Sequence, residues 1–219
     1  MNNYIIFDMD GVLLDSEPIH MEVERRLFEQ LKIKVTEELH HSFVGMAPRR
    51  MWEITKKEFQ LLQEVDELLE LDKTIRLEAF KDLEITASRH LETLLDDLKK
   101  NDFSLSIASS SPKKLIELIT ERLEISHYFD ILISGEEVEN GKPHPDIFLK
   151  AASFYQKAPK FFTVIEDSTN GIKAAKAAGM KCIAYRNPNS GKQDLSEADL
   201  IIDSFSELNV EVISRLPSS

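Results

Sequence analysis

The sequence is poor in cysteine and in long apolar runs, and its basic residues are outnumbered by acidic ones. The single cysteine, Cys182, cannot form an internal disulfide bond. No apolar run approaches the roughly 20 residues that a membrane-spanning helix needs. The 39 acidic and 27 basic residues give a net charge of −12, which argues against nucleic-acid binding because that function needs a basic face. A small anionic substrate is still compatible with this charge, provided that its site carries its own positive charge.

The beginning of the sequence also lacks the basic segment, the apolar segment and the cleavage site of a signal peptide. Together with the lone cysteine, this absence favours the cytoplasm. The composition, 42% hydrophobic and 30% charged, is typical of a soluble globular protein. We therefore expect a cytoplasmic protein that acts as a monomer and has neither nucleic-acid nor membrane partners.

Short apolar runs rich in β-branched residues alternate along the chain with helical patterns. The apolar runs suit strands that are buried on both faces of a sheet. Residues 112–123 are one of the helical patterns, with Leu115, Leu118 and Ile119 on one stripe. This alternation predicts an α/β fold with a mostly parallel sheet and helices on both of its faces. The expected strands are residues 4–7, 103–108, 129–134, 161–165, 181–185 and 198–203.

Residues 16–85 break this alternation and contain no convincing strand. A helix is expected just after Ser16, because Ile19, Val23 and Leu27 recur every fourth residue. We therefore expect a small α-helical domain over residues 16–85, inserted after the first strand. The sheet domain would then be built from residues 1–15 and 86–219.

Polar clusters stand where the expected strands end. Asp8 and Asp10 follow the first strand, residues 109–111 (Ser-Ser-Ser) follow the second, and residues 166–168 (Glu-Asp-Ser) follow the fourth. Lys142 opens the helical pattern that precedes the fourth strand. Since the carboxyl ends of parallel strands meet at one edge of a sheet, where ligands of such folds bind, these groups are expected to lie together.

The chemistry that fits this set is phosphoryl transfer. Carboxylates drawn together repel one another unless a cation joins them, and Mg²⁺ prefers carboxylate and phosphate oxygens. A carboxylate can attack phosphorus, hydroxyl and backbone N–H groups can hold phosphoryl oxygens, and a lysine can neutralise the transferred group. Each motif alone has a plainer interpretation, as a solvated turn, a helix N-cap or an exposed lysine. Their joint placement at strand ends favours the functional interpretation.

The motifs "DMDGVLLDS", "ASSS", "GKPHPDIF" and "VIEDSTNGI" together resemble those of the haloacid dehalogenase superfamily, in the branch with a helical cap after the first strand. This branch includes sugar phosphatases and β-phosphoglucomutases. The resemblance covers essentially the whole chain. It implies a Rossmann-like core, a cap over residues 16–85 that selects the substrate, Mg²⁺ as cofactor, and an aspartyl-phosphate intermediate.

The resemblance also implies roles for individual residues. Asp8 matches the nucleophile, and Asp10 matches the general acid/base that protonates the leaving group and then activates water or a second hydroxyl. Asp167 matches a Mg²⁺ ligand, with Glu166 beside it. The Asp8 carboxylate and the Asp10 backbone carbonyl are the other implied Mg²⁺ ligands. The implied phosphate-binding groups are Ser109, the backbone of Ser110, and Lys142.

Three functions remain after this comparison. The favoured one is a phosphatase of small phosphate monoesters such as a sugar phosphate, and the second is a β-phosphoglucomutase. A mutase must hold a second phosphate in the cap, and His20 matches a histidine of the mutases. The candidates for holding that phosphate are Arg49, Arg50, Lys73 and Arg76. The third, a non-enzymatic domain that signals through phospho-aspartate, is disfavoured. Such domains are about half as long, lack a cap, and place their acid pair before the phosphorylated aspartate.

Overall fold

The computed structural model describes residues 4–36, 39 and 48–216. The chain divides into two compact units. The first comprises Met1–Ser16 and Ile85–Ser219 and contains the sheet, whereas the second comprises Glu17–Glu84 and is helical. Each unit has buried apolar side chains of its own.

The sheet of the first unit has six strands, and every neighbouring pair is parallel. The strand order is β3-β2-β1-β4-β5-β6, so β1 is flanked by β2 and β4. The apolar run of β1 is explained by this position, because Ile5, Ile6 and Phe7 are completely buried. The predicted α/β fold with a parallel sheet is therefore confirmed. The strands are β1 (Tyr4–Phe7), β2 (Ser104–Ser109), β3 (Ile131–Ser134), β4 (Phe162–Glu166), β5 (Lys181–Tyr185) and β6 (Leu200–Ile202).

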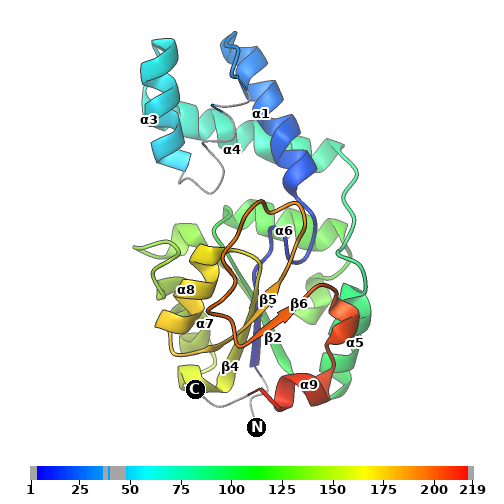
Figure 1. The fold of residues 1–219 in the computed structure, drawn as a ribbon. Coiled ribbons are helices and arrows are strands. Elements are labelled where there is room, and N and C mark those ends of the chain that lie inside the picture. The colour runs from blue at the N-terminus through cyan, green and yellow to red at the C-terminus, as the bar shows by residue number, and fades with distance from the viewer. Residues whose placement is uncertain (1–3, 37–38, 40–47, 217–219) are drawn as a thin grey trace. The chain divides into compact units, whose positions relative to one another are not determined.

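Helices cover both faces of the sheet, with α7 and α8 on the same face (Figure 1). The connections through α5 and α6 lead from β1 to β2 and β3, whereas those through α7 and α8 lead back from β3 to β4 and β5. Because crossovers between parallel strands are right-handed, these opposite directions place the two pairs on opposite faces. The helices are α5 (Leu91–Lys100), α6 (Lys113–Arg122), α7 (Asp146–Phe154), α8 (Thr169–Ala177) and α9 (Val210–Ser214), with short 3₁₀ helices at Ser126–Tyr128, Gly135–Glu137, Pro159–Phe161 and Phe205–Glu207.

The buried face of α6 differs from the stripe expected from the sequence. Leu115 and Ile119 are completely buried as predicted, but Leu118 is only half-buried and Ile116 is buried in its place. Thr120 belongs to the same buried face, since its hydroxyl donates to the Ile116 carbonyl oxygen at 2.9 Å. In the sequence a threonine counts as polar, although its hydroxyl can bond to a backbone carbonyl of its own helix and so be buried. The centre of the buried face of α6 is therefore hard to see from the sequence.

The described residues of the second unit include α1 (Glu17–Leu31), α3 (Pro48–Phe59) and α4 (Val65–Asp82). Its described residues contain no strand, and α4 packs against both α1 and α3. The repeat of Ile19, Val23 and Leu27 faces inward, with exposed fractions of 5%, 0% and 0%. Trp52 and Phe80 complete the packing from α3 and α4, and both are completely buried.

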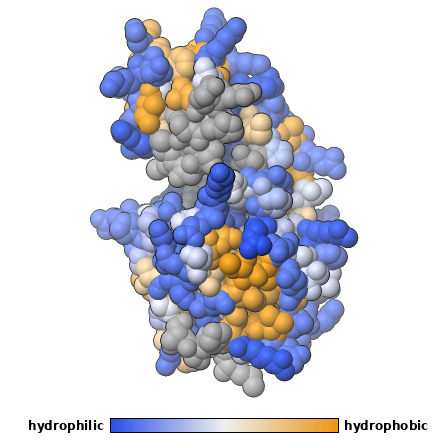
Figure 2. Space-filling model, in the orientation of Figure 1, coloured by the Kyte–Doolittle hydropathy of each residue, from blue (hydrophilic) through white to orange (hydrophobic). Residues whose placement is uncertain are grey.

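Much of the visible surface is hydrophilic, and on the sheet unit an apolar patch lies over the β5 and β6 region (Figure 2). Ile201 of β6 contributes to the exposed apolar surface, with 37% of its area accessible. Within the described ranges, none of the helices combines the length and the apolar character needed to cross a membrane.

Candidate active site

The register of β1 and β4 brings two of the predicted clusters together. Phe7 pairs with Ile165, and the backbone N–H of Asp8 donates to the Ile165 carbonyl oxygen at 2.9 Å. Asp8 therefore follows β1 at the level where Glu166 ends β4. The chain leaves β1 for β2 on one side and returns to β4 on the other, which is the arrangement that opens a ligand crevice at the carboxyl ends of a parallel sheet.

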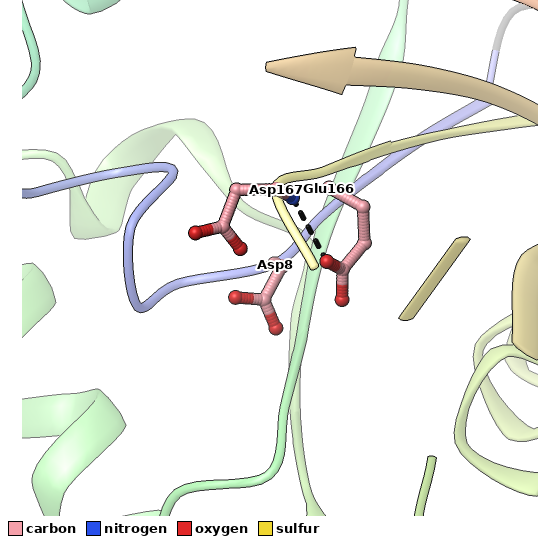
Figure 3. Close-up of side chains that lie close together, drawn as sticks. All are labelled: Asp8, Glu166 and Asp167. Carbon is pink, nitrogen blue, oxygen red and sulfur yellow. Dashed lines mark hydrogen bonds between the residues drawn. The ribbon is translucent and has the colours of Figure 1, made fainter. Parts of the chain in front are cut away.

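Asp8, Glu166 and Asp167 form a buried cluster of carboxyl groups at this edge (Figure 3). Each offers one oxygen atom, and these three oxygens all lie within 4.8 Å of one another. Their residues are only 7%, 1% and 7% exposed. Such a donor set suits a hard divalent cation, because carboxylate oxygens are the ligands that Mg²⁺ prefers and a cation offsets their mutual repulsion.

Lys142 provides positive charge at the same place. Its Nζ lies 2.5 Å from Oδ1 of Asp8 and 2.7 Å from Oε1 of Glu166, and it also donates to the Ala108 carbonyl oxygen at 3.2 Å. Burial alone would lower the pKa of Lys142, but the Asp8 and Glu166 carboxylates hold that pKa above its ordinary value. Lys142 lies in the turn before α7 rather than in its first helical turn, which begins at Asp146.

Two acids of the cluster, Asp8 and Asp167, have pKa values above those of ordinary carboxyl groups. Burial is the largest cause of the raised pKa of Asp8, to which Glu166 and Asp167 add, while Lys142 acts in the opposite direction. Burial, and next the Glu166 charge, raise the pKa of Asp167 to about 7. A bound cation would favour the deprotonated carboxylates, so metal and protons compete for this cluster.

Glu166 is fixed by several donors. Its Oε2 accepts the backbone N–H of Asp167 at 2.8 Å, the N–H of Ser168 at 2.9 Å and the Ser168 hydroxyl at 2.9 Å. Its Oε1 accepts from Lys142, so Glu166 orients the lysine as well as belonging to the acid cluster. The Ser168 hydroxyl also accepts the Gly171 N–H at 3.0 Å, which makes Ser168 the N-cap of α8. Gly171 leaves the space that this carboxylate fills, a role that the sequence did not indicate.

The serine run that begins at the last residue of β2 lies next to Asp10. The Ser111 hydroxyl donates to Oδ2 of Asp10 at 2.8 Å, and the Ser111 N–H donates to the Ser109 hydroxyl at 3.0 Å. Ser109 is 1% exposed, whereas Ser110 is exposed. The contact between Ser111 and Asp10 was not predicted, because the resemblance assigns roles only to the first two serines of the run.

A second contact to the site comes from the loop after β5, which appears in the sequence as nothing more than a turn-rich stretch. The Ser190 hydroxyl donates to Oδ2 of Asp167. Gly11, which has φ +77°, lies against the same oxygen, since a Cβ there would be 2.0 Å from it. Gly11 is therefore required both by its backbone conformation and by the position of Asp167.

The helical unit holds a polar cluster of its own, built around Asp72. The Asp72 carboxylate accepts from Trp52 Nε1 at 3.1 Å and from Arg76 Nε and Nη2 at 3.2 and 2.8 Å. Arg76 Nη1 lies 2.5 Å from Nδ1 of His20. Because a guanidinium can only donate, Nδ1 of His20 is the acceptor in this contact. Two of the sequence candidates in this unit are therefore in direct contact.

Two further candidates of the helical unit are placed differently. Arg49 pairs with Asp66 at 2.6 Å, and both side chains are largely exposed, at 60% and 80%. Lys73 is half-buried on α4.

Comparison with known proteins identifies the family. Phosphorylated carbohydrates phosphatase from Thermotoga maritima is 31% identical over 86% of this chain and 88% of its own length. The solved structure of β-phosphoglucomutase from Clostridium difficile has a TM-score of 0.80 and 28% identity, covering 98% of this chain and 96% of that one. CbbY from Rhodobacter sphaeroides in complex with phosphate shares the fold, with a TM-score of 0.86, 23% identity and coverage of 98% and 100%. The model of the haloacid dehalogenase-like hydrolases matches residues 5–185, which confirms the resemblance read from the motifs: the chain belongs to the haloacid dehalogenase-like hydrolase family.

Proposed function

We propose that this chain is a Mg²⁺-dependent phosphatase of small phosphate monoesters, with a phosphorylated sugar as substrate and Asp8 as nucleophile. The observation that carries the proposal is the position of Asp8 at the end of β1, where its carboxylate lies 2.5 Å from Lys142 Nζ and within the acid cluster. The similarity to a phosphatase of phosphorylated carbohydrates supports the choice of substrate class.

In the first step the Asp8 carboxylate attacks the phosphorus, and the bond from phosphorus to the leaving oxygen breaks. Asp10 gives its proton to that oxygen, so the alcohol leaves neutral. The ammonium of Lys142, already hydrogen-bonded to Asp8, offsets charge on the transferred group. The Ser109 hydroxyl and the Ser110 N–H are proposed to hold the phosphoryl oxygens.

In the second step Asp10 takes a proton from water, whose oxygen attacks the aspartyl-phosphate. Inorganic phosphate leaves and the Asp8 carboxylate is restored, so atoms and charges balance over the cycle. Ser111 would keep Asp10 in place for both proton transfers, through its 2.8 Å hydrogen bond. Mg²⁺, held by the carboxylates of Asp8, Glu166 and Asp167 and the Asp10 carbonyl, would supply positive charge to the phosphoryl group.

We further propose that residues 16–85 act as a cap that selects the substrate and excludes bulk water, as lids of enzymes do. The substrate-contacting residues proposed there are His20, Arg49, Lys73 and Arg76. Of these, Arg76 is the best prepared to bind an anion, because Asp72 holds its guanidinium by two hydrogen bonds.

A β-phosphoglucomutase activity is the second candidate. It is favoured by the similarity to the C. difficile β-phosphoglucomutase and by the ordered Arg76, which could hold a second phosphate. In that reaction a sugar hydroxyl would replace water as the group that attacks the aspartyl-phosphate.

A panel of sugar phosphates separates the two candidates. The purified chain would be incubated with each ester in Mg²⁺ or in EDTA, and both inorganic phosphate and conversion of β-glucose 1-phosphate to glucose 6-phosphate would be measured. A phosphatase releases phosphate from several esters and forms no glucose 6-phosphate. A mutase converts β-glucose 1-phosphate to glucose 6-phosphate and releases little inorganic phosphate. Equal turnover in EDTA and in Mg²⁺ would contradict the metal requirement.

A further inference from the structure

We infer that Ser190, in the loop after β5, is a positioning residue for the magnesium site. Its hydroxyl donates to Oδ2 of Asp167, a carboxylate that is only 7% exposed. Ser190 belongs to none of the four motifs by which the family was recognised. The inference rests on the proposed function, because it assigns Ser190 a task only if Asp167 binds Mg²⁺.

The surroundings of Oδ2 show that this contact is built into the site. A Cβ on Gly11 would lie 2.0 Å from Oδ2 of Asp167 and 3.0 Å from the Ser190 hydroxyl oxygen. Oδ2 is therefore enclosed between the bare backbone of Gly11 and the Ser190 hydroxyl. A carboxylate held in this way keeps the orientation of its plane, which is the property that hydrogen-bonded partners give to metal ligands.

The loop that carries Ser190 is itself fastened at two places. The Asn187 side chain, 9% exposed, donates to the Gly11 carbonyl oxygen at 3.0 Å. The Gln193 side-chain amide donates to the Ser190 carbonyl oxygen at 2.9 Å, and its Oε1 accepts the Thr169 N–H at 2.9 Å. One anchor is thus the turn after β1 and the other is the start of α8. These anchors hold Ser190 in place before any ligand binds. Little conformational entropy of the Ser190 side chain is therefore lost when the metal binds.

A purely structural role for Ser190 predicts a different result from a positioning role. If the hydroxyl only stabilised the loop, its loss would lower the free energy of unfolding measured without metal. If it orients Asp167, its loss would weaken Mg²⁺ binding while the metal-free fold stays intact. Removing a partner that orients a metal ligand typically costs about 10- to 100-fold in metal affinity.

The test is calorimetric titration of the metal-free full chain with Mg²⁺ alone, comparing the wild type, Ser190→Ala and Ser196→Ala. Ser196 is the matched control, because it is an exposed serine of the same stretch whose N–H and hydroxyl both contact Asp194, which is not part of the acid cluster. Thermal unfolding in EDTA checks the fold of each variant. We expect the Mg²⁺ dissociation constant to rise about 10- to 100-fold for Ser190→Ala, and to stay at the wild-type value for Ser196→Ala.

Two results would overturn the inference and leave the proposed function standing. One is a Ser190→Ala variant that binds Mg²⁺ as tightly as the wild type. The other is weaker binding accompanied by an equal loss of stability in EDTA, which would reveal a structural role. A wild-type chain that binds no Mg²⁺ would instead refute the metal requirement of the proposed function, and this inference with it.

Discussion

Gly171 and Glu166 fit together so closely that a Cβ on Gly171 would lie 1.7 Å from Oε1 of Glu166 and 1.9 Å from its carboxyl carbon. Glu166 could not move away from this Cβ easily, because its carboxylate accepts hydrogen bonds from two backbone N–H groups and from the Lys142 ammonium. Gly171 lies in the first turn of α8, where alanine would otherwise favour the helix by about 1 kcal/mol. A glycine at this position therefore makes α8 less stable locally, but it leaves the space that Glu166 and its partner Lys142 need.

Replacing Gly171 by alanine should displace the Glu166 carboxylate and loosen Lys142. We expect phosphatase activity to fall at least about tenfold, as a small displacement at a reacting centre does. The free energy of unfolding should fall by about 1–3 kcal/mol through overpacking, despite the better helix propensity. Urea unfolding and steady-state kinetics measure the two effects. Gly141→Ala is the matched control, because a Cβ there would meet nothing within 4 Å, and a Gly171→Ala variant that behaves like it would contradict this account of the site.

Asp8→Asn should abolish turnover and leave the fold intact. The amide keeps the shape of the side chain but cannot attack phosphorus, so we expect a loss of at least about a thousandfold. Lys142 keeps Glu166 as its partner at 2.7 Å, so it is not left buried without a counter-charge. Activity would be measured by phosphate release, and mass spectrometry would exclude deamidation back to aspartate. A fully active variant would refute the assignment of the nucleophile.

That the acids of the candidate site meet at one edge of the sheet could be predicted, because β1 and β4 are so strongly apolar that their ends are visible in the sequence. Ile5, Ile6 and Phe7 run directly into Asp8, and the same contrast marks Glu166 after Ile165. A fully buried strand needs such residues, and a polar cluster at its end is then conspicuous. The parallel alternation placed these ends on one edge, which the register of Phe7 with Ile165 confirms.

The residues that support the candidate site could not be predicted in the same way, and neither could the polar cluster of the helical unit. Gly171 and Ser190 in the sheet unit, and Asp72 in the helical unit, each contact a side chain far away or across a turn, and single-sequence patterns report burial periodicity rather than such contacts. Asp72 is the clearest case, because α4 is rich in acids and an acid there looks solvated. It is 5% exposed because the Trp52 indole and the Arg76 guanidinium satisfy it.

Metal-free protein should lose stability as the pH rises from about 4 to about 7. In this window the folded state keeps a proton on Asp167, whose pKa is raised from 3.8 to about 7, chiefly by burial, whereas the unfolded state has released it. The unfolded state then binds fewer protons, so the free energy of unfolding falls with pH, by at most about 1.4 kcal/mol per pH unit for one group. Mg²⁺ should stabilise the protein more at pH 8 than at pH 5.5, since it replaces that proton.

Urea unfolding in EDTA and in Mg²⁺, at several pH values, measures this dependence. Asp167→Asn is the comparison, because the amide carries no titrating proton and should flatten the part of the slope due to Asp167. The same slope in the variant and in the wild type would show that Asp167 does not titrate in this range.

Asp72→Asn should weaken the helical unit and its Arg76. The amide loses the charge that Arg76 requires, and its NH₂ group would face either the indole N–H or the guanidinium, both of which are donors. We expect a loss of about 1–3 kcal/mol in the free energy of unfolding, because a buried hydrogen-bonding partner is lost. If Arg76 contacts substrate, KM should rise more than kcat falls. Asp66→Asn is the control, since its pair with Arg49 is largely exposed and should contribute less than about 1 kcal/mol.

Asp10→Asn should slow the reaction more for substrates with poor leaving groups than for substrates with good ones. For a sugar phosphate, whose alkoxide leaves poorly, loss of the acid should slow the first step by about 10²- to 10⁴-fold, the usual contribution of general acid catalysis. For p-nitrophenyl phosphate the leaving group needs little protonation, so the first step should suffer less. Hydrolysis of the aspartyl-phosphate still needs the base, so phosphate should accumulate on Asp8.

Rapid acid quench of Asp10→Asn with ³²P-labelled p-nitrophenyl phosphate would capture that intermediate as protein-bound label. Asp10→Asn/Asp8→Asn is the control and should retain none, because it lacks the attacking carboxylate. Ser111→Ala should show a weaker form of the same behaviour, because Ser111 holds Asp10 through a 2.8 Å hydrogen bond but does not itself protonate the leaving group or deprotonate water. Equal losses on good and poor leaving groups, with no trapped phosphate, would leave Asp10 as a structural or metal-orienting residue and would refute the acid–base role proposed for it.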